Sequence, residues 1–418
     1  MNFCIYGLGS TGLSVVNYFK KNRFLDYKVW DDQIKKKKEK NFFLKSLDLS
    51  DYIILSPGIS LKKAKLRKKL LKNKHKIITD LDLFYLFNPE IKTIVVTGTN
   101  GKSTTCKILE HVLKKNKINV MLGGNIGKPV LDLDLKTKPI VIIEASSFQL
   151  AYSQFIKPDY AAILNITNDH IDWHSSLKNY VDSKFKIFLN QKSNNFAFLN
   201  NKELVRKFKK NKYKSNLKFI NLKKYKKIKN KIKNNYLNLE VNNENMNYVF
   251  SICKILKIKE KSFIKSLKSF KGLDHRHEVF YKKNNKTFIN DSKATSFQST
   301  KFALQNNKNI FWIVGGLPKI KDKLELTKVK KNIIKAYVVG KHMNTFKKYL
   351  KNQVNFKLCE TLKKAVASIF EDTKNINDRQ ITILLSPASA SYDQFNNFEE
   401  RGNIFKKLVI NSSKRKSF

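Results

Sequence analysis

Residues 93–104 read Thr93-Ile-Val-Val-Thr-Gly-Thr-Asn-Gly-Lys-Ser-Thr104. The first five predict a buried strand, the glycines predict a tight turn, and the pattern that continues to Lys115 predicts a helix. At such a junction, backbone N–H groups and the positive end of the helix face a phosphate. Lys102 would reach the β- and γ-phosphates of a nucleotide, and Ser103 would offer its hydroxyl to Mg²⁺. The alternative is a turn that only links the strand to the helix.

The region around this turn continues as an α/β pattern. Apolar strands are predicted at 140–143 and 160–164, and each is followed by polar residues. The lysine-rich segment 202–243 has little periodicity, and we expect a β-meander there. We assign residues 90–272 to a central mononucleotide-binding domain of the P-loop ATPase type.

The same alternation of strands and helices flanks this central domain on both sides. The predicted strands are residues 3–6, 27–30 and 52–55 before it, and residues 311–314, 336–339 and 381–385 after it. The sequence therefore predicts an α/β protein of three domains, with a Rossmann-like N-terminal domain at 1–89 and a Rossmann-like C-terminal domain at 273–418.

A second glycine turn, Gly7-Leu-Gly-Ser-Thr-Gly12, follows the first strand, and Asp31 and Asp32 come about 20 residues later. This spacing is typical of dinucleotide binding. Taken alone, it indicates a nicotinamide-dependent oxidoreductase, or else an ordinary strand–helix turn. The oxidoreductase hypothesis leaves the loop at 98–104 without a role.

The charge of the chain is unusual. Its 418 residues include 84 Lys and Arg against 33 Asp and Glu, a formal net charge of +51. One explanation is a nucleic-acid-binding NTPase, or a protein that binds an anionic membrane surface. The other is compositional drift, because Asn, Ile and Phe are abundant as well. The lysine runs at 35–38 and 223–227 lack the regular aromatic or glycine spacing of nucleic-acid readers, so we expect no specific nucleic-acid partner.

Cysteine and hydropathy patterns bear on location. Cys4, Cys106, Cys253 and Cys359 are far apart, which argues against a zinc site or a disulfide framework and fits a reducing cytoplasm. No run approaches 18 apolar residues, and residues 1–6 lead directly into a glycine turn instead of a signal sequence. We therefore expect a cytoplasmic protein without membrane insertion.

Polar residues at strand ends are further candidates for chemistry. Glu144 ends a buried strand beside the phosphate loop, where it would either bind Mg²⁺ or only cap the strand. Asp169 and His170 follow the next strand. The clusters at 274–278 and 290–295 are compact and polar, and a buried salt-bridge network is the alternative to a ligand site there.

Three motifs together resemble the Mur ligase family of ATP-dependent amide-forming enzymes of peptidoglycan precursor synthesis. They are the short loop at 97–104, Glu144-Ala-Ser-Ser-Phe-Gln-Leu150, and the block from Leu385 to Gly402. The resemblance extends in order from Gly7 to Phe405. Folylpolyglutamate synthase shares the loop but usually has another glycine where this chain has Ser103. Within the Mur family the motifs are similar to those of the members that add D-glutamate to UDP-N-acetylmuramoyl-L-alanine.

The resemblance implies a site for ATP, two Mg²⁺ ions and a lysine carbamate formed from CO₂. Its implied catalytic residues are Lys102, His170 and Lys184, with Lys184 as the carbamylated residue. Its implied ATP-binding residues are Gly98, Thr99, Asn100, Gly101, Lys102, Ser103, Thr104, Asn247, Arg276 and Asp291. Its implied metal-binding residues are Ser103, Glu144, His170 and Lys184.

The resemblance also implies sites for the other two substrates, in a protein expected to be a monomer. The residues implied for the UDP-sugar are Ser10, Thr11, Asp31, Asp32 and Asn125. Those implied for D-glutamate are Lys293, Thr295, Lys319, Ser391, Tyr392 and Phe398. Tyr392 stands where the family has an aliphatic residue, and Phe250 replaces an asparagine on the adenine side.

Overall fold

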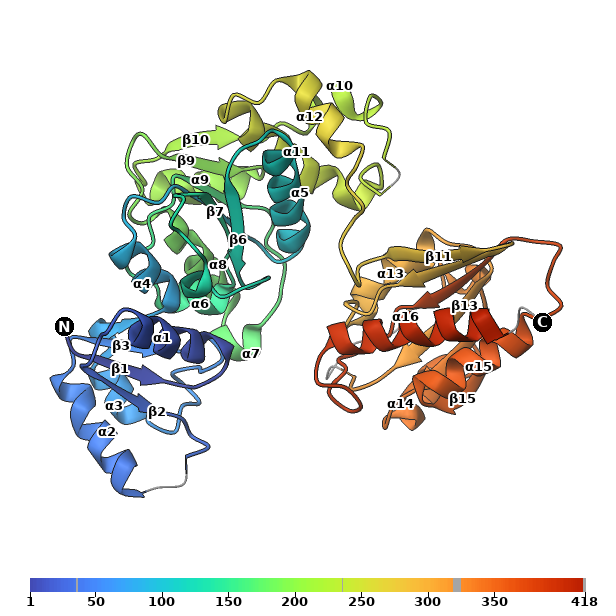
Figure 1. Ribbon diagram of the computed structural model, residues 1–418, viewed down its shortest axis with the longest axis horizontal. Helices are drawn as coiled ribbons and strands as arrows, with labels where there is room; N and C mark the ends of the chain where they lie inside the picture. Colours follow the sequence, from blue (N-terminus) through green and yellow to red (C-terminus); the bar gives the residue numbers. More distant parts are fainter. Residues whose placement is uncertain (35–36, 235, 319–324, 416–418) are drawn as a thin grey trace. The chain divides into compact units, whose positions relative to one another are not determined.

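The computed structural model describes residues 1–34, 37–234, 236–318 and 325–415. The chain divides into two compact units, Met1–Lys271 and Gly272–Phe418, which are described separately. Three sheets organise the chain, two in the first unit and one in the second (Figure 1).

The first sheet has the strand order β2-β1-β3-β4, and its paired strands are parallel. Its strands are β1 (Phe3–Tyr6), β2 (Tyr27–Trp30), β3 (Tyr52–Leu55) and β4 (Ile77–Ile78). The helices that accompany it are α1 (Ser10–Lys21), α2 (Lys37–Leu49) and α3 (Arg67–Lys72). The first three strands begin and end where the sequence predicts them. β1 and β3 are short apolar runs that are mostly buried, whereas β2 is an edge strand in which only Trp30 is buried.

The second sheet is also parallel, in the order β10-β9-β8-β5-β7-β6. Its strands are β5 (Thr93–Thr97), β6 (Val120–Gly124), β7 (Ile140–Glu144), β8 (Tyr160–Ile163), β9 (Phe196–Leu199) and β10 (Asn216–Phe219). Its helices are α5 (Lys102–Lys115), α6 (Ser147–Tyr152), α7 (Ile171–His174), α8 (Leu177–Phe185), α9 (Lys202–Lys210), α10 (Leu222–Lys229), α11 (Asn243–Ile255) and α12 (Glu260–Leu267).

The prediction of a β-meander at 202–243 is wrong. This segment forms α9, then β10, which pairs in parallel with β9, and then α10. The lysines conceal an amphipathic helix, because Leu204, Val205 and Phe208 lie on one side of α9 and pack on the core of the unit. A parallel edge strand needs a crossover helix, and α9 is that helix.

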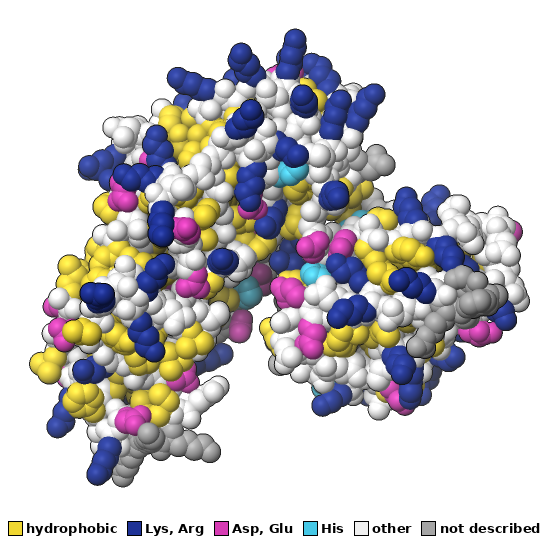
Figure 2. All heavy atoms as spheres, viewed as in Figure 1, with side chains coloured by type: hydrophobic (Ala, Val, Ile, Leu, Met, Phe, Trp, Pro, Cys, Tyr) yellow, Lys and Arg dark blue, Asp and Glu magenta, His cyan; other side chains and the backbone are white. Residues whose placement is uncertain are grey.

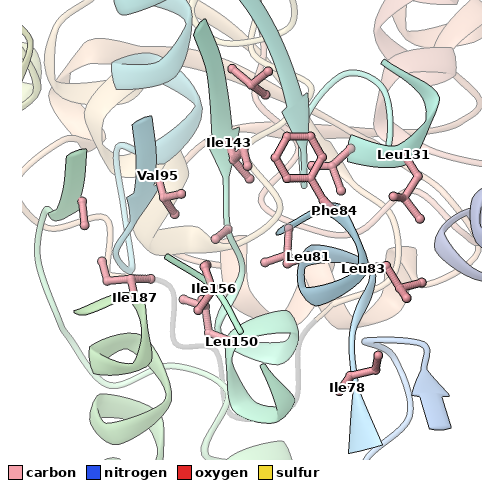
Figure 3. Packing of buried hydrophobic residues seen from close by; sticks show 14 of the residues in the cluster. Ile78, Leu81, Leu83, Phe84, Val95, Leu131, Ile143, Leu150, Ile156 and Ile187 are labelled. Atoms are coloured by element: carbon pink, nitrogen blue, oxygen red, sulfur yellow. The ribbon is translucent and has the colours of Figure 1, made fainter. Parts of the chain in front are cut away.

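Helix α4 (Asp80–Phe87) connects the two sheets of the first unit through a continuous core. Its buried Leu81, Leu83 and Phe84 belong to the same apolar cluster as residues of both sheets. Figure 3 shows Phe84 of α4 beside Ile143 of β7. The N-terminal sheet is therefore fixed to the central sheet by buried apolar contacts.

The sheet of the second unit has the order β11-β12-β16-β13-β14-β15, in which only the β11–β12 pair is antiparallel. Its strands are β11 (Glu278–Lys283), β12 (Lys286–Asn290), β13 (Ile310–Gly315), β14 (Ile333–Val339), β15 (Phe356–Glu360) and β16 (Ile381–Leu385). Its helices are α13 (Phe297–Gln305), α14 (Met343–Leu350), α15 (Leu362–Asp372) and α16 (Phe398–Arg415). Apolar clusters cover both faces of the sheet, as expected for a doubly wound domain.

The predicted α/β architecture of three parallel-sheet domains is confirmed. In the part of the chain that the structure describes, no helix combines the length and apolarity needed to cross a membrane. On the face seen in Figure 2, Lys and Arg side chains lie at many separate places on both units.

Candidate active site

The phosphate loop lies between β5 and α5, at the carboxyl end of the central sheet. Gly98 and Gly101 have φ of +151° and +83°, values that L side chains rarely adopt. A Cβ at Gly101 would lie 2.1 Å from Asn245 Oδ1, so the loop also needs glycine for space. Helix α5 begins at Lys102, and the N–H groups of its first turn point out of its positive end.

Two lysine amines meet at one carbonyl oxygen of this loop. Lys102 Nζ donates to Gly98 O at 2.9 Å and to Thr99 O at 2.8 Å. Lys184 Nζ, from α8, donates to the same Gly98 O at 2.9 Å and to Thr97 Oγ1 at 3.4 Å. The structure therefore brings together Lys102, which the loop motif singles out, and Lys184, whose role only the family resemblance implies.

The environment of Lys184 disfavours its charged form. The residue is 1% exposed. Burial lowers the pKa of its amine well below the usual value, and the charge of Lys102 lowers this pKa further. A larger share of Lys184 is consequently neutral and nucleophilic than for a lysine at the surface.

The loop is supported by Asn165, a residue that the sequence analysis did not assign. The N–H groups of Thr99 and Asn100 donate to Asn165 O and Oδ1, each at 2.8 Å. Asn165 Nδ2 donates to Glu244 Oε2 at 2.8 Å. The position of Asn165 directly after a predicted strand was the available signal, but its partners lie 65 and 79 residues away in the sequence.

Glu144 ends β7 and pairs in register with Val96, one residue before the last residue of β5. It is 2% exposed, and Asn125 Nδ2 donates to its Oε1 at 2.9 Å. Its Oε2 is buried and has no hydrogen-bond partner among the described residues. A buried carboxylate oxygen without a hydrogen-bond partner is suited to bind a cation at this place.

The protein alone supplies few metal ligands here. Within residues 1–34, 37–234, 236–318 and 325–415, no three His, Cys, Asp or Glu side chains gather into a metal-binding group. Mg²⁺ usually binds through one or two carboxylates together with phosphate oxygens and water. Glu144 and the hydroxyl of Ser103, in the first turn of α5, therefore fit a Mg²⁺ ion that arrives with a nucleotide.

His170 directly precedes α7 with a positive φ of 53°, and its Nε2 lies 3.4 Å from Asp169 Oδ2. The sequence analysis did not identify His174, one turn later, whose Nε2 is 3.0 Å from Ser147 Oγ. Burial lowers the pKa of His174 to about 4, and the charge of Lys184 contributes. His174 is thus a neutral, buried neighbour of the lysine site.

The remaining residue assigned to the nucleotide in this unit is Asn247. It is buried on α11, and its Nδ2 donates to Asn243 O at 2.7 Å. Helix α11 packs against α5, whose first turn carries the phosphate loop. Asn247 therefore lies on a helix that supports the loop.

The first glycine turn, which leads from β1 into α1 at Ser10 and Thr11, is bordered by carboxylates. Asp31 Oδ2 accepts the N–H of Leu8 at 2.7 Å, and Asp32 Oδ2 accepts the hydroxyl of Tyr6 at 2.7 Å. The two aspartates therefore help to hold the turn. Asn125 is instead bound to Glu144, beside the central sheet.

In the second unit, Asp291 and Arg276 lie near each other. Asp291 Oδ2 accepts the Ser386 hydroxyl at 2.7 Å, and its Oδ1 accepts the N–H of His277 at 3.0 Å. Burial raises the pKa of Asp291 to about 6, although its hydrogen bonds and the charge of Arg276 oppose this. Arg276 Nε is buried and finds no partner in the described part of the chain.

The residues assigned to D-glutamate lie on three segments of the same unit. Lys293 Nζ is 4.9 Å from the centre of the Phe398 ring. Thr295 is half-buried, Ser391 is 2% exposed and Tyr392 is 72% exposed. Lys319 is outside the described residues.

Two family models match the first unit. The Mur ligase middle domain matches residues 96–266, and the Mur ligase MurD-like N-terminal domain matches residues 1–79.

Curated relatives match along nearly the whole chain. A UDP-N-acetylmuramoylalanine–D-glutamate ligase of Wolbachia sp. subsp. Brugia malayi is 36% identical over 472 residues, which cover 96% of this chain and 94% of the relative. The protein of the same description from Rickettsia felis is 34% identical over 435 residues, with 97% and 96% covered.

Solved structures share the fold at lower identity. The UDP-N-acetylmuramate–alanine ligase MurC of Thermotoga maritima has a TM-score of 0.56 at 17% identity and covers 99% of this chain and 100% of its own. The MurF ligase of Thermotoga maritima, in complex with ADP, has a TM-score of 0.57 at 15% identity, with 91% and 94% covered. At these identities the likeness concerns the fold alone.

Proposed function

The chain belongs to the Mur ligase family, and from this premise we propose that it joins D-glutamate to UDP-N-acetylmuramoyl-L-alanine with ATP, in peptidoglycan precursor synthesis. The observation that carries the proposal is the full-length similarity to D-glutamate ligases, combined with the loop at which Lys102 and Lys184 meet. We further propose cytoplasmic location, a monomer, and domains at 1–89, 90–272 and 273–418.

The reaction must activate a carboxylate before an amine can attack it. The γ-phosphoryl group of ATP passes to the alanyl carboxylate, which gives an acyl phosphate and ADP. The amine of D-glutamate then attacks the acyl carbon, the C–N bond forms, phosphate leaves and the amine loses a proton. Lys102, beside the phosphate loop, would neutralise the approaching anions by exchanging its bonds to Gly98 O and Thr99 O for phosphate oxygens.

For the metal ions, we assign Glu144 through its orphaned Oε2, the Ser103 hydroxyl, His170 and the carbamate of Lys184 as ligands. Bound Mg²⁺ would reduce the repulsion between the phosphates and the carboxylate. Asn125, which directly follows β6, would hold Glu144 in place through its bond to Oε1. It would also contact the sugar nucleotide.

We propose that Lys184 reacts with CO₂. A neutral amine is needed for this step, and burial beside Lys102 favours that form. Nitrogen attacks carbon, a C–N bond forms and one proton is lost, which leaves an anionic carbamate. The positive charge of Lys102 disfavours an ammonium at Lys184. The same charge would stabilise a negatively charged carbamate there.

The remaining assignments divide by substrate. Ser10, Thr11, Asp31 and Asp32 would bind the uridine diphosphate end of the nucleotide sugar at the first glycine turn. Thr99, Asn100, Thr104, Asn247, Arg276 and Asp291 complete the proposed ATP site. Lys293, Thr295, Lys319, Ser391, Tyr392 and Phe398 make up the proposed D-glutamate site.

One assay tests the proposal. Phosphate release from ATP is measured with UDP-N-acetylmuramoyl-L-alanine and each amino acid in turn. We expect release with D-glutamate and little with L-glutamate or D-alanine. Release that depends on a polynucleotide would contradict the proposal and favour a nucleic-acid-binding NTPase. Binding of NADH in place of the nucleotide sugar would favour a nicotinamide-dependent oxidoreductase.

A further inference from the structure

A single buried arginine connects the segments that would bind the amino-acid substrate. Arg401 lies near the start of α16 in the second unit and is 1% exposed. It is among the largest fully buried side chains of the described chain. Arg401 lies inside the family block from Leu385 to Gly402, but the sequence analysis gives it no role of its own.

Its guanidinium binds two separate loops. Nε donates to Ser292 Oγ at 3.0 Å, and Nη2 donates to Ser292 O at 2.8 Å and to Ser389 O at 3.1 Å. Ser292 Oγ in turn donates to Phe398 O at 2.8 Å, at the start of the same helix. One planar group thus fixes the distance between the segment that carries Lys293 and the segment that carries Ser391.

A third segment contacts the same group. A Cβ on Gly316 would lie 3.3 Å from Arg401 Nη1 and 2.5 Å from Ala390 O, and Gly316 has a φ of +131°. Leu317 and Ala390 exchange backbone hydrogen bonds of 2.9 and 3.0 Å. The absence of a side chain at Gly316 therefore lets this strand end pack on the arginine.

The positive charge of Arg401 is poorly compensated. The oxygens that accept its hydrogen bonds are two carbonyls and a hydroxyl, all neutral. Its buried Nη1 has no hydrogen-bond partner among the described residues. Burial lowers its pKa to about 10, although the charge of Asp393 opposes this, so it stays charged at neutral pH. A buried charge without a counter-charge destabilises the fold. A role in ligand binding therefore explains the presence of Arg401 better than a contribution to stability does.

We propose that Arg401 is a positioning residue of the amino-acid site: it holds the segments around Ser292, Gly316 and Ser389 in register, and its unpaired charge attracts an amino acid that carries two carboxylates. Arg401 acts through these segments and does not touch the substrate. The inference rests on the proposed function, because Lys293 and Ser391 are assigned to D-glutamate there.

Two variants separate geometry from charge. R401K keeps the charge but cannot reproduce the three hydrogen bonds, whereas R401M removes both. We expect the KM for D-glutamate to rise about tenfold in R401K and about a hundredfold in R401M, the range for lost hydrogen bonds to a charged group. The KM for ATP should change less than about twofold, because Lys102 lies in the other unit and the Asp291 carboxylate is held by Ser386 and the N–H of His277, not by Arg401.

A charge-specific measurement distinguishes this role from a purely structural one. The wild type should prefer D-glutamate to D-glutamine, which has one carboxylate fewer, and R401M should lose most of that preference while R401K retains it. The matched control is R379M, which removes an exposed arginine of the same unit and should leave both KM values and the preference unchanged.

The outcomes are distinct. If the wild type does not use D-glutamate, the proposed function is wrong. If the wild type uses it and R401M keeps the wild-type KM for D-glutamate and the preference over D-glutamine, only the inference about Arg401 is wrong. Should R401M not yield folded protein, R401K decides, because an unchanged KM for D-glutamate in that variant overturns the inference by itself.

Discussion

The first unit contains two glycine turns with the same construction and opposite electrostatics. Each follows an interior strand of a parallel sheet, β1 or β5, and leads into a helix, α1 or α5. In the first turn, Gly7 O accepts the neutral hydroxyl of Ser56 at 2.8 Å, and a carboxylate of Asp31 accepts the next N–H. In the second, Gly98 O accepts two lysine amines.

This difference shows how one local structure supports two tasks. The backbone of each turn is determined by glycines within a few residues, whereas Asp31 and Lys184, which contribute charge to the two turns, come from farther along the chain. The second turn, with Lys102 and Lys184, suits a triphosphate. The first suits a ligand bound mainly through N–H groups and neutral hydroxyls. Variants at each turn test that division.

The largest effect is expected for Lys102→Ala. Removing the amine that would neutralise the phosphates should lower kcat for phosphate release at least about a thousandfold. Lys107→Ala is the matched control on the same helix, where the amine only pairs with Glu110 at 3.0 Å, and its activity should be near normal. Substantial turnover by Lys102→Ala would remove the phosphate loop from the mechanism.

Lys184→Ala tests the second amine at the same carbonyl. We expect an inactive enzyme that regains part of its turnover when a short-chain carboxylic acid is added, since the acid can replace the carbamate. Lys186→Ala is the matched control, because this lysine is also partly buried and bound to carbonyls, at Ala151 and Ser153. Equal rescue of both variants, or full activity without any acid, would contradict the carbamate proposal.

The first turn is tested by Gly12→Ala. A Cβ there would lie 1.9 Å from Gly7 O, so the turn must open. We expect the KM for the nucleotide sugar to rise about tenfold, the KM for ATP to stay the same, and the free energy of unfolding to fall by about 1–3 kcal/mol. Gly58→Ala, with no atom within 4 Å of its added Cβ, is the control. If Gly12→Ala raises the KM for ATP as much as the KM for the nucleotide sugar, the two turns do not bind separate substrates.

Sequence patterns predict the parts of this protein that depend on neighbouring residues. The strands, both turns and the position of Lys184 on a helix follow from short apolar runs, glycine spacing and family motifs. The contributions of Asn165 and Arg401 do not, because Asn165 bonds to residues 65 and 79 positions away and Arg401 joins Ser292, 109 positions away, to Ser389. The amphipathic helix α9 was missed for another reason, since lysines dominate its composition while its three apolar residues carry the packing.

The smallest effect concerns Asp80, at the start of the helix that connects the two sheets. It is fully buried beside Gln149, whose Nε2 lies 3.2 and 3.3 Å from its carboxylate oxygens. Burial raises the pKa of Asp80 to about 6, with the nearby Asp82 adding to the shift and Gln149 opposing it. Because the native state holds the proton more tightly than the unfolded state, Asp80 lowers stability as the pH rises from about 4 to about 6.

Asp80→Asn keeps an oxygen for Gln149 and removes the buried charge. At pH 7 the variant should be more stable than the wild type by up to about 3 kcal/mol, and the difference should vanish near pH 4. Urea unfolding at several pH values measures it. Asp82→Asn should instead destabilise, because Asp82 accepts the N–H groups of Thr79, Gln154 and Phe155 and one of its acceptors would become a donor. If Asp80→Asn is less stable than the wild type at pH 7, the buried carboxylate is needed as an anion, and the connection between the two sheets depends on that charge.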